Sequence, residues 1–140
     1  MSQDNLELRT PTDADTKLRA FFQRFNQTRE SQLEALHPEI AWHIRADLPD
    51  SRTLCGYEDV ERRDTDWRRA FADLQLEPIE VSEASGKTIV VVHFHGRLKG
   101  SRDVVDMNEV WVLRWRDDRI IEISEYETKT EALKGVESAE

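Results

Sequence analysis

The chain has 140 residues, 29 of them acidic and 20 basic, with a net charge of -9 and a sequence pI near 5.0. This length fits one domain with a real core, and the acidic balance argues against nucleic acid or an anionic membrane surface as a partner. Cys55 is the only cysteine, which excludes an internal disulfide, and no apolar run reaches the ~20 residues of a membrane span or has the form of a signal peptide. We therefore expect a cytoplasmic protein.

The first half of the chain predicts three helices. Residues 1–11 are polar without a sustained period and are expected to form a flexible arm. Thr12 can cap a helix, after which apolar side chains recur at helical spacing, at Leu18, Phe21, Phe22 and Phe25. We expect this stripe to face the core. A short helix is expected over about residues 30–36, and a longer one over about residues 57–74.

Alternation between apolar and polar side chains predicts the strands. Residues 40–44 alternate as a first strand, and a loop is expected after them, up to residue 53. A short strand over residues 76–82 and a long one over residues 88–99 flank a turn at Ser85-Gly86. Residues 101–133 read as a strand, a charged turn, a second strand and a closing helix. Helices followed by a mostly antiparallel sheet define an α+β domain.

The terminal hairpin has one face that is apolar except for two carboxylates. Before the turn at residues 116–119, one parity collects Met107, Glu109, Trp111, Leu113 and Trp115. After the turn, the same face collects Ile121, Ile123 and Glu125. Carboxylates among tryptophans point to a pocket. A bulge would shift the parity and place Asp106, Asn108 and Val110 there instead of Glu109 and Trp111.

This ending, Gly100-Ser101 followed by VVDMNEVWVLRWRDDRIIEISEYETKTEAL, resembles the terminal hairpin of SnoaL-like proteins, which belong to the larger group of nuclear transport factor 2 and ketosteroid isomerase. The segments LEALHPEIAWHI, GYEDV and GKTIVVVHFHGRLKG extend the resemblance over nearly the whole chain. It implies a cone-shaped α+β domain over residues 12–135, with N-terminal helices on a curved, mostly antiparallel sheet that encloses a pocket. Residues 136–140 would be a flexible tail, and two copies would pair through the sheet face.

Glu125 is the first candidate for a catalytic group. A carboxyl in apolar surroundings loses solvation, which raises its pKa and poises it to accept or donate a proton. In SnoaL-like cyclases an acidic residue at about this place abstracts a carbon-bound proton, although the family has aspartate where this chain has Glu125. The alternative is a glutamate at the pocket rim that pairs with an arginine.

Glu109 and Trp111 occupy the facing strand. In ketosteroid isomerase a protonated acid about here donates a hydrogen bond to the developing oxyanion, and the matching position in this chain holds Trp111. Its indole N–H could donate to a carbonyl oxygen, and Glu109 could do so if protonated. The alternative is that Trp111 only fills the core.

His43 and Asp64 are further catalytic candidates. The resembling families often show Trp-His-Asp where this chain has Trp42, His43 and Ile44, so the aspartate base of ketosteroid isomerase is missing. Strict alternation from Trp42 would also direct His43 away from the pocket. Asp64 lies one turn before Trp67 and either faces the pocket or belongs to the solvated edge of its helix.

Two histidines, His93 and His95, share one face of a predicted strand. Such a pair can bind zinc or iron, but no third ligand accompanies it in motif spacing, so we expect no metal. A polar face of this kind suits a subunit interface. Cys55 lacks a catalytic arrangement around it, and the glycine-rich and nucleophile motifs of the common cofactor-binding and hydrolytic enzymes are missing. We expect no cofactor.

These observations favour a cofactor-free, SnoaL-like isomerase or cyclase that abstracts a proton from a small apolar cyclic or polyketide-like molecule. The expected substrate-binding side chains are aromatic: Trp42, Tyr57, Trp67, Phe71, Trp111 and Tyr126. One alternative is a non-catalytic domain of the same fold that binds a ligand or a protein. Another is a hydrolase or dehydratase, which requires His43 or Asp64 within hydrogen-bond reach of Glu125, directly or through a water.

Overall fold

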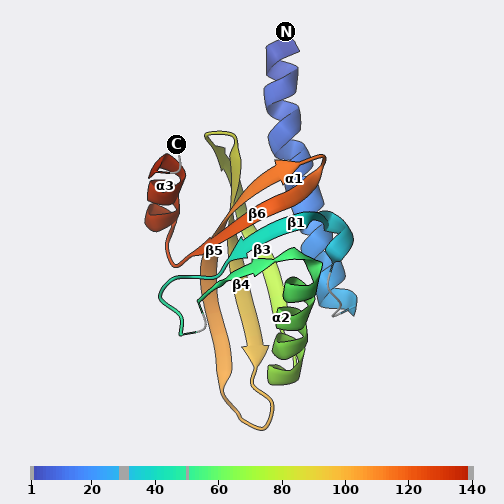
Figure 1. Cartoon of the computed structure of the whole chain (residues 1–140), viewed down its shortest axis with the longest axis vertical. Coiled ribbons are helices and arrows are strands. Elements are labelled where there is room, and N and C mark those ends of the chain that lie inside the picture. The colour runs from blue at the N-terminus through green and yellow to red at the C-terminus, as the bar shows by residue number, and fades with distance from the viewer. Residues whose placement is uncertain (1, 29–31, 50, 139–140) are drawn as a thin grey trace.

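A computed structural model of the chain describes residues 2–28, 32–49 and 51–138, with side chains placed for 14–28, 32–49 and 51–137. Three α-helices and one 3-10 turn pack on a six-stranded sheet (Figure 1). The elements in chain order are α1 (Ser2–Thr28), η1 (Leu33–Ala35), β1 (Leu36–His43), β2 (Thr53–Cys55), α2 (Gly56–Ala70), β3 (Gln75–Ala84), β4 (Lys87–Arg97), β5 (Val104–Arg116), β6 (Arg119–Tyr126) and α3 (Lys129–Ser138).

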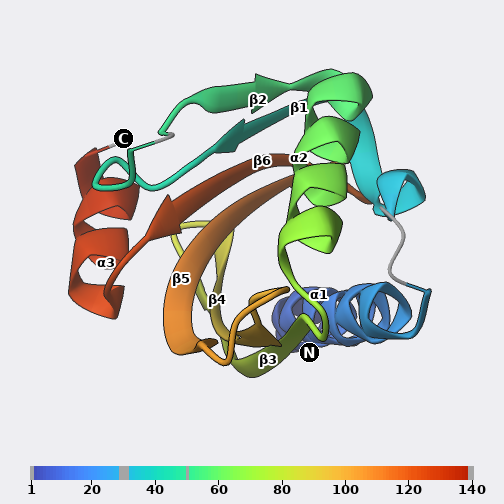
Figure 2. The same ribbon diagram turned by 90° about the horizontal axis from the view of Figure 1, so that it is seen from below.

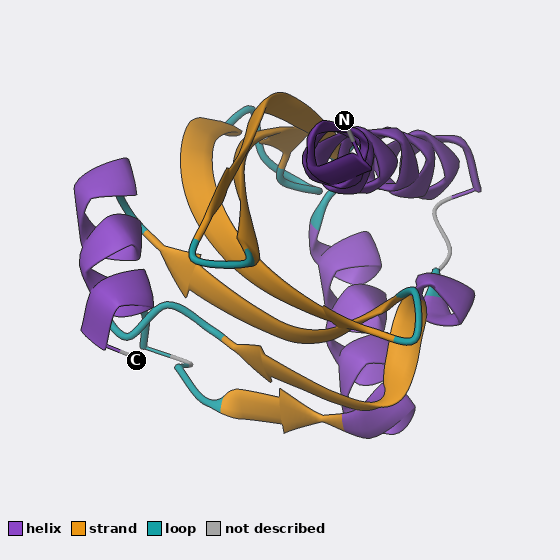
Figure 3. Ribbon diagram, turned by 90° about the horizontal axis from the view of Figure 1, so that it is seen from above, coloured by secondary structure: helices purple, strands orange, loops and turns teal. Residues whose placement is uncertain are grey.

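The sheet is strongly curved and has the strand order β2-β1-β6-β5-β4-β3 (Figure 2). Neighbouring strands are antiparallel except β1 and β6, which pair in parallel. Helices α1 and α2 lie on the concave side, and α3 lies on the opposite side (Figure 3). This confirms the predicted cone-shaped α+β fold. Of the helices in the described ranges, none is long and apolar enough to cross a lipid bilayer.

Helix α1 is held by its apolar stripe and by one polar clamp. Leu18, Phe22 and Phe25 are buried against the sheet, as predicted. The amide of Asn26 donates to the carbonyl of Leu76 and accepts from the N–H of Leu76, each at 2.9 Å. This pair of bonds satisfies backbone groups on β3, an edge strand that would otherwise leave them open.

The predicted start of this first helix at Thr12 is wrong, because α1 begins at Ser2. Its first turns extend beyond the sheet (Figure 1), so they need no periodic apolar face, which is the signal that sequence analysis followed. Leu6, Glu7 and Leu8 are strong helix formers. The flexibility of residues 1–11 stays a prediction, and Met1 lies outside the described residues.

Three further boundaries differ from the prediction. The helix expected over residues 30–36 is only the 3-10 turn η1, and β1 already begins at Leu36; residues 30 and 31 lie outside the described ranges. Strand β2 lies at the end of the predicted loop and is too short to show alternation. Helix α2 ends at Ala70 instead of about residue 74, because Phe71 turns extended and bridges to Leu98.

The terminal hairpin has the predicted inward face, with one change of parity. Glu109, Trp111 and Leu113 of β5 point into the cone, so the alternative with Asp106, Asn108 and Val110 inward is wrong. In β6, Ile123 and Glu125 point inward, but Ile120 is buried in place of the expected Ile121. The cause is a register shift between Arg114 and Trp115, which advances the pairing by one residue.

Helix α3 covers part of the convex face of the sheet. A second cluster of buried side chains forms there from Ile89, Val110 and Val112 of the sheet with Ala132 and Val136 of α3. The predicted tail at residues 136–140 therefore starts too early, since Val136 is 3% exposed within a helix that continues to Ser138. Residues 139 and 140 lie outside the described ranges.

Candidate functional site

A small cavity lies inside the cone, between the concave face of the sheet and helices α1 and α2. Its volume is about 20 Å³, which is room for about one water molecule. Most of the lining is aromatic, with Asp64 as its charged member; the lining residues are Phe21, Phe22, Phe25, Gln32, Leu36, Trp42, Val60, Asp64, Trp67, Leu76 and Trp111. A cavity therefore lies where the apolar pocket was predicted, but aromatic rings fill most of the space.

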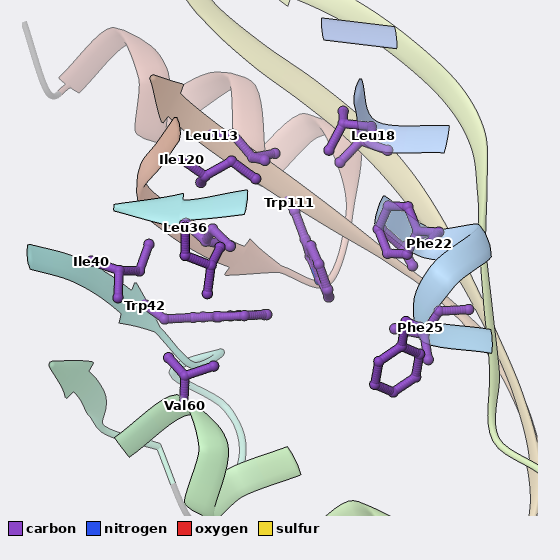
Figure 4. Close-up of a cluster of buried hydrophobic side chains, with 14 of the residues drawn as sticks. Leu18, Phe22, Phe25, Leu36, Ile40, Trp42, Val60, Trp111, Leu113 and Ile120 are labelled. Atoms are coloured by element: carbon purple, nitrogen blue, oxygen red, sulfur yellow. The ribbon is translucent and has the colours of Figure 1, made fainter. Parts of the chain in front are cut away.

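Trp111 is at the centre of these rings. Its ring centroid lies 5.1 Å from that of Trp42, 5.7 Å from Phe22 and 6.2 Å from Phe94. Figure 4 shows Trp42 from β1 and Trp111 from β5 pointing toward Phe22 and Phe25 of α1. Aromatic pairs at such distances stabilise each other beyond simple burial. This cluster therefore holds α1 against the strands β1, β4 and β5.

Glu125 is buried behind Trp42, with a side chain that is 0% exposed. Its Oε2 accepts hydrogen bonds from the indole N–H of Trp42 at 2.7 Å and from Nη1 of Arg63 at 2.9 Å. Its Oε1 accepts the backbone N–H of Arg45 at 3.3 Å. The guanidinium of Arg63 also lies over the ring of Trp67, 4.3 Å from its centroid. Both oxygens of Glu125 are thus engaged with donors.

Glu109 belongs to a second buried ion pair. Its Oε2 accepts from Nη1 of Arg45 at 3.1 Å, and its Oε1 accepts from the indole N–H of Trp111 at 3.0 Å. Arg45 continues to Asp47, with Nε at 3.0 Å from Oδ1 and Nη2 at 2.6 Å from Oδ2. Arg45 therefore connects a buried carboxylate to one at the surface, where the side chain of Asp47 is 52% exposed.

The two pairs are electrically balanced, with two buried carboxylates and two guanidiniums. Burial raises the pKa of Glu109, and the nearby negative charge of Glu125 raises it further. The hydrogen bond from Arg45 lowers the pKa of Asp47, and the same bond raises the pKa of Arg45. Glu109 is thus the carboxyl in this cluster that the surroundings push toward its protonated form.

His43 lies on the convex face of the sheet. Its Nδ1 is 2.9 Å from Oγ1 of Thr53, and its Nε2 is 2.9 Å from Oε2 of Glu122. In the part of the chain that the structure describes, the hydrogen-bond partners of Glu125 are Trp42, Arg45 and Arg63, so neither His43 nor Asp64 contacts it. The direct contact that a hydrolase or dehydratase could use is missing from these residues.

The other predicted residues divide between the cavity and positions outside it. Asp64, Trp42, Trp67 and Trp111 line the cavity. Three predicted aromatic side chains do not line it, namely Tyr57, Phe71 and Tyr126. Tyr57 donates from Oη to the carbonyl of Leu36 at 2.7 Å, Phe71 packs at the edge of the core, and Tyr126 packs against α3. Their expected part in substrate binding stays a prediction.

The predicted histidine pair lies on the convex face, where His93 contacts acidic side chains. Its Nε2 is 2.6 Å from Oδ1 of Asp106, and this hydrogen bond lowers the pKa of Asp106. Across the described ranges, no group of three or more histidine, cysteine, aspartate or glutamate side chains is placed to hold a metal ion. Pairing of two copies through this face stays a prediction.

Sequence analysis missed Arg45 and Arg63, the two residues that hold the carboxylates. Arg63 had a signal, because it falls between Val60 and Trp67 on the inward stripe of α2. Arg45 had none, because β1 ends at His43 and alternation no longer applies where the chain turns. Phe21, Phe22 and Phe25 were predicted as core, and they also line the cavity.

A cone with helices on its concave face, an aromatic cavity and buried carboxylates at its inner wall defines a protein of the nuclear transport factor 2-like class. The model of the SnoaL-like domain matches residues 18–123, and the chain therefore belongs to the SnoaL-like family. Curated proteins gave no match to this sequence.

Solved structures share the fold at low sequence identity. A nuclear transport factor 2-like protein of unknown function from Burkholderia pseudomallei has 18% identity and a TM-score of 0.67, with 87% of this chain and 95% of that chain covered. A candidate SnoaL-like polyketide cyclase from a Jannaschia species has 18% identity and a TM-score of 0.64, with coverage of 87% and 88%. TerC, crystallised with polyporic acid, has 13% identity and a TM-score of 0.68, with coverage of 89% and 98%.

Proposed function

We propose that this chain binds a small, flat, largely apolar molecule in the aromatic cavity of the cone. The observation that carries the proposal is the lining itself, in which rings from α1, α2, β1 and β5 converge on one point. Ligand sites are mostly apolar with a few polar groups that fix orientation, and Gln32 and Asp64 are such groups here. The presence of polyporic acid in TerC supports a small-molecule role for this fold.

Binding is better supported than proton abstraction by Glu125. A general base needs a lone pair that faces the substrate. The oxygens of Glu125 accept bonds from Trp42, Arg63 and Arg45, and Glu125 is not among the residues that line the cavity. The carboxylate is therefore placed to hold Trp42 and α2 in position.

A second candidate function is the cofactor-free isomerase or cyclase chemistry, with Glu109 in place of Glu125 as the acid or base. Two observations favour it: Glu109 accepts a hydrogen bond from Trp111, which lines the cavity although Glu109 itself does not, and burial together with Glu125 raises the pKa of Glu109. Trp111 would orient the carboxyl through its indole N–H. Arg45 would have to release Glu109 and stay with Asp47, to which it already makes two bonds. The polyketide cyclase candidate from Jannaschia supports this chemistry for the fold.

The four indole N–H signals of the protein offer a direct test of binding by nuclear magnetic resonance. Trp42, Trp67 and Trp111 line the cavity, whereas the indole of Trp115 donates to Thr88 outside it. Because the closed cavity has a volume of only about 20 Å³, a ring enters it only when the lining side chains move. Titration with phenol, a single neutral ring, is then expected to shift the first three signals in a saturable way and to leave Trp115 unchanged. A panel of one-ring and two-ring compounds that shifts none of the three in the folded protein would overturn the binding proposal.

Turnover is tested separately with Glu109→Gln and Glu125→Gln. Each variant replaces one carboxyl by an amide of nearly the same size, so both variants keep the volume of the site. If the isomerase proposal holds, a compound that the wild type converts loses its conversion in Glu109→Gln and retains binding. Equal conversion by Glu109→Gln and the wild type would reject Glu109 as the acid or base.

A further inference from the structure

A surface groove lies next to the cavity, between α1, η1 and the turn that joins β5 to β6. Its volume is about 250 Å³, and its walls are mostly apolar. The apolar side chains that form it include Ala20, Phe21, Ala35, Trp115 and Ile120. The groove is more than ten times larger than the cavity, whose volume is about 20 Å³.

Two residues, Phe21 and Gln32, line both the groove and the cavity. Phe21 is half-buried, and its ring contacts Phe22 edge to face, with centroids 5.2 Å apart at 80°. Gln32 is 8% exposed, and its Nε2 lies 3.3 Å from Oγ1 of Thr28. Among the residues that the structure describes, one aromatic ring and one amide thus separate the cavity from the groove. The ring has no hydrogen bond to break when it rotates.

We propose that Phe21 is a movable partition and that its rotation joins the cavity and the groove into one elongated ligand site. This inference rests on the binding function proposed above. A cavity that holds benzene has about 150 Å³, so the closed cavity is too small for any ring, while the joined space is large enough. The ligand would be a flat molecule of at least two rings, with one end at Trp111 and the other over Trp115.

The charges of the groove favour a neutral ligand. Nζ of Lys17 lies 3.0 Å from Asp118 and 5.6 Å from the centroid of the Trp115 ring. Nη1 of Arg24 lies 4.0 Å from Glu34. Each of these cations has an acidic partner within the groove, so the described lining residues carry no surplus charge that would offset the desolvation of an ionic ligand.

The test uses two neutral probes, phenol and 4-phenylphenol, and the anion 4-phenylbenzoate. In the wild type, 4-phenylphenol is expected to shift the indole signals of Trp111 and Trp115 together with one affinity, and 4-phenylbenzoate is expected to bind at least tenfold more weakly, about 1.4 kcal/mol. If Trp111 shifts and Trp115 does not, the ligand stays in the cavity and the joined site is wrong. Equal or tighter binding of the anion would overturn the neutral class.

A matched pair of variants tests the partition. Phe21→Leu shortens the partition, whereas Phe25→Leu makes the same change at a residue that lines only the cavity. Because an opening step slows association, Phe21→Leu should raise the association rate constant of 4-phenylphenol about tenfold, and Phe25→Leu should change it less than about twofold. Equal rates in both variants would overturn the partition while binding stands. An absence of signal shifts with every probe in folded wild type and variants would overturn the binding function itself.

Discussion

Removal of Arg63 is expected to destabilise the fold strongly, because Glu125 would keep its burial and lose its cation. The two side chains are 8% and 0% exposed, and 2.9 Å separates Nη1 from Oε2. Breaking a buried pair by removing one partner costs about 3–5 kcal/mol, out of a total stability of about 5–15 kcal/mol for a domain. Arg63→Met keeps much of the apolar stem of the side chain and removes the guanidinium that lies over the ring of Trp67.

The assay is urea unfolding followed by tryptophan fluorescence. With a slope of about 2 kcal/mol per molar urea, the loss corresponds to a midpoint lowered by about 2 M. The double variant Arg63→Met, Glu125→Gln should recover part of the loss, because the unpaired buried charge is gone. The unfolding midpoint of Arg63→Lys should lie between those of the wild type and Arg63→Met, since an ammonium keeps the charge but not the planar stacking on Trp67. A loss below about 1 kcal/mol in Arg63→Met would refute the account of the pair as buried and mutually dependent.

Three further predictions concern packing and pH. Gly96→Ala should destabilise by about 1–3 kcal/mol in urea unfolding, because its Cβ would lie 3.0 Å from Phe71 and 3.3 Å from Cα of Leu74; an unchanged midpoint would contradict it. Gly135→Ala should destabilise the wild type, since the new Cβ would meet Tyr126, but should stabilise a Tyr126→Ala background by about 1 kcal/mol through helix propensity; the same sign in both backgrounds would reject this contact. Burial raises the pKa of Glu122, but hydrogen bonds from Arg114 and His43 outweigh this effect and leave the pKa below the ordinary 4.5. The ionised Glu122 therefore stabilises the fold above pH 4.5, and this stabilisation disappears as the pH falls through the pKa of the folded state. Unfolding midpoints between pH 6 and pH 3 should therefore fall less in Glu122→Gln than in the wild type, and parallel curves would contradict this.

The strand pattern predicted much of the fold and the buried carboxylates of the site, but not the arginines that pair with them. Period-two alternation placed Glu109, Trp111 and Glu125 on the inner face, and the structure places them there. Alternation is a local property, so it survives wherever the ladder is regular. It failed at Ile121, where a register shift that depends on the partner strand exchanged this residue for Ile120.

The arginines that pair with the carboxylates could not be predicted from local pattern either, because they come from distant parts of the chain. Arg63 and Glu125 are 62 residues apart, and Arg45 and Glu109 are 64 apart, so no spacing rule connects them. The end of α2 also depends on a residue that is distant in the sequence, because Gly96 lets the chain after Ala70 approach β4 closely. The volume of the cavity depends on how all the rings pack together, and composition holds no information on that.

The parallel pairing of β1 with β6 has a consequence for folding during synthesis on the ribosome. Residues near the start of the chain are completed by residues near its end, since Trp42 and Glu125 meet across 83 positions. While the ribosome has not yet released β6, Arg63 and the indole of Trp42 lack the carboxylate of Glu125, and the core lacks Ile120 and Ile123. Contacts of such long range slow folding and delay it until synthesis is nearly finished. A nascent chain that stops before Arg119 is therefore a natural client for chaperones.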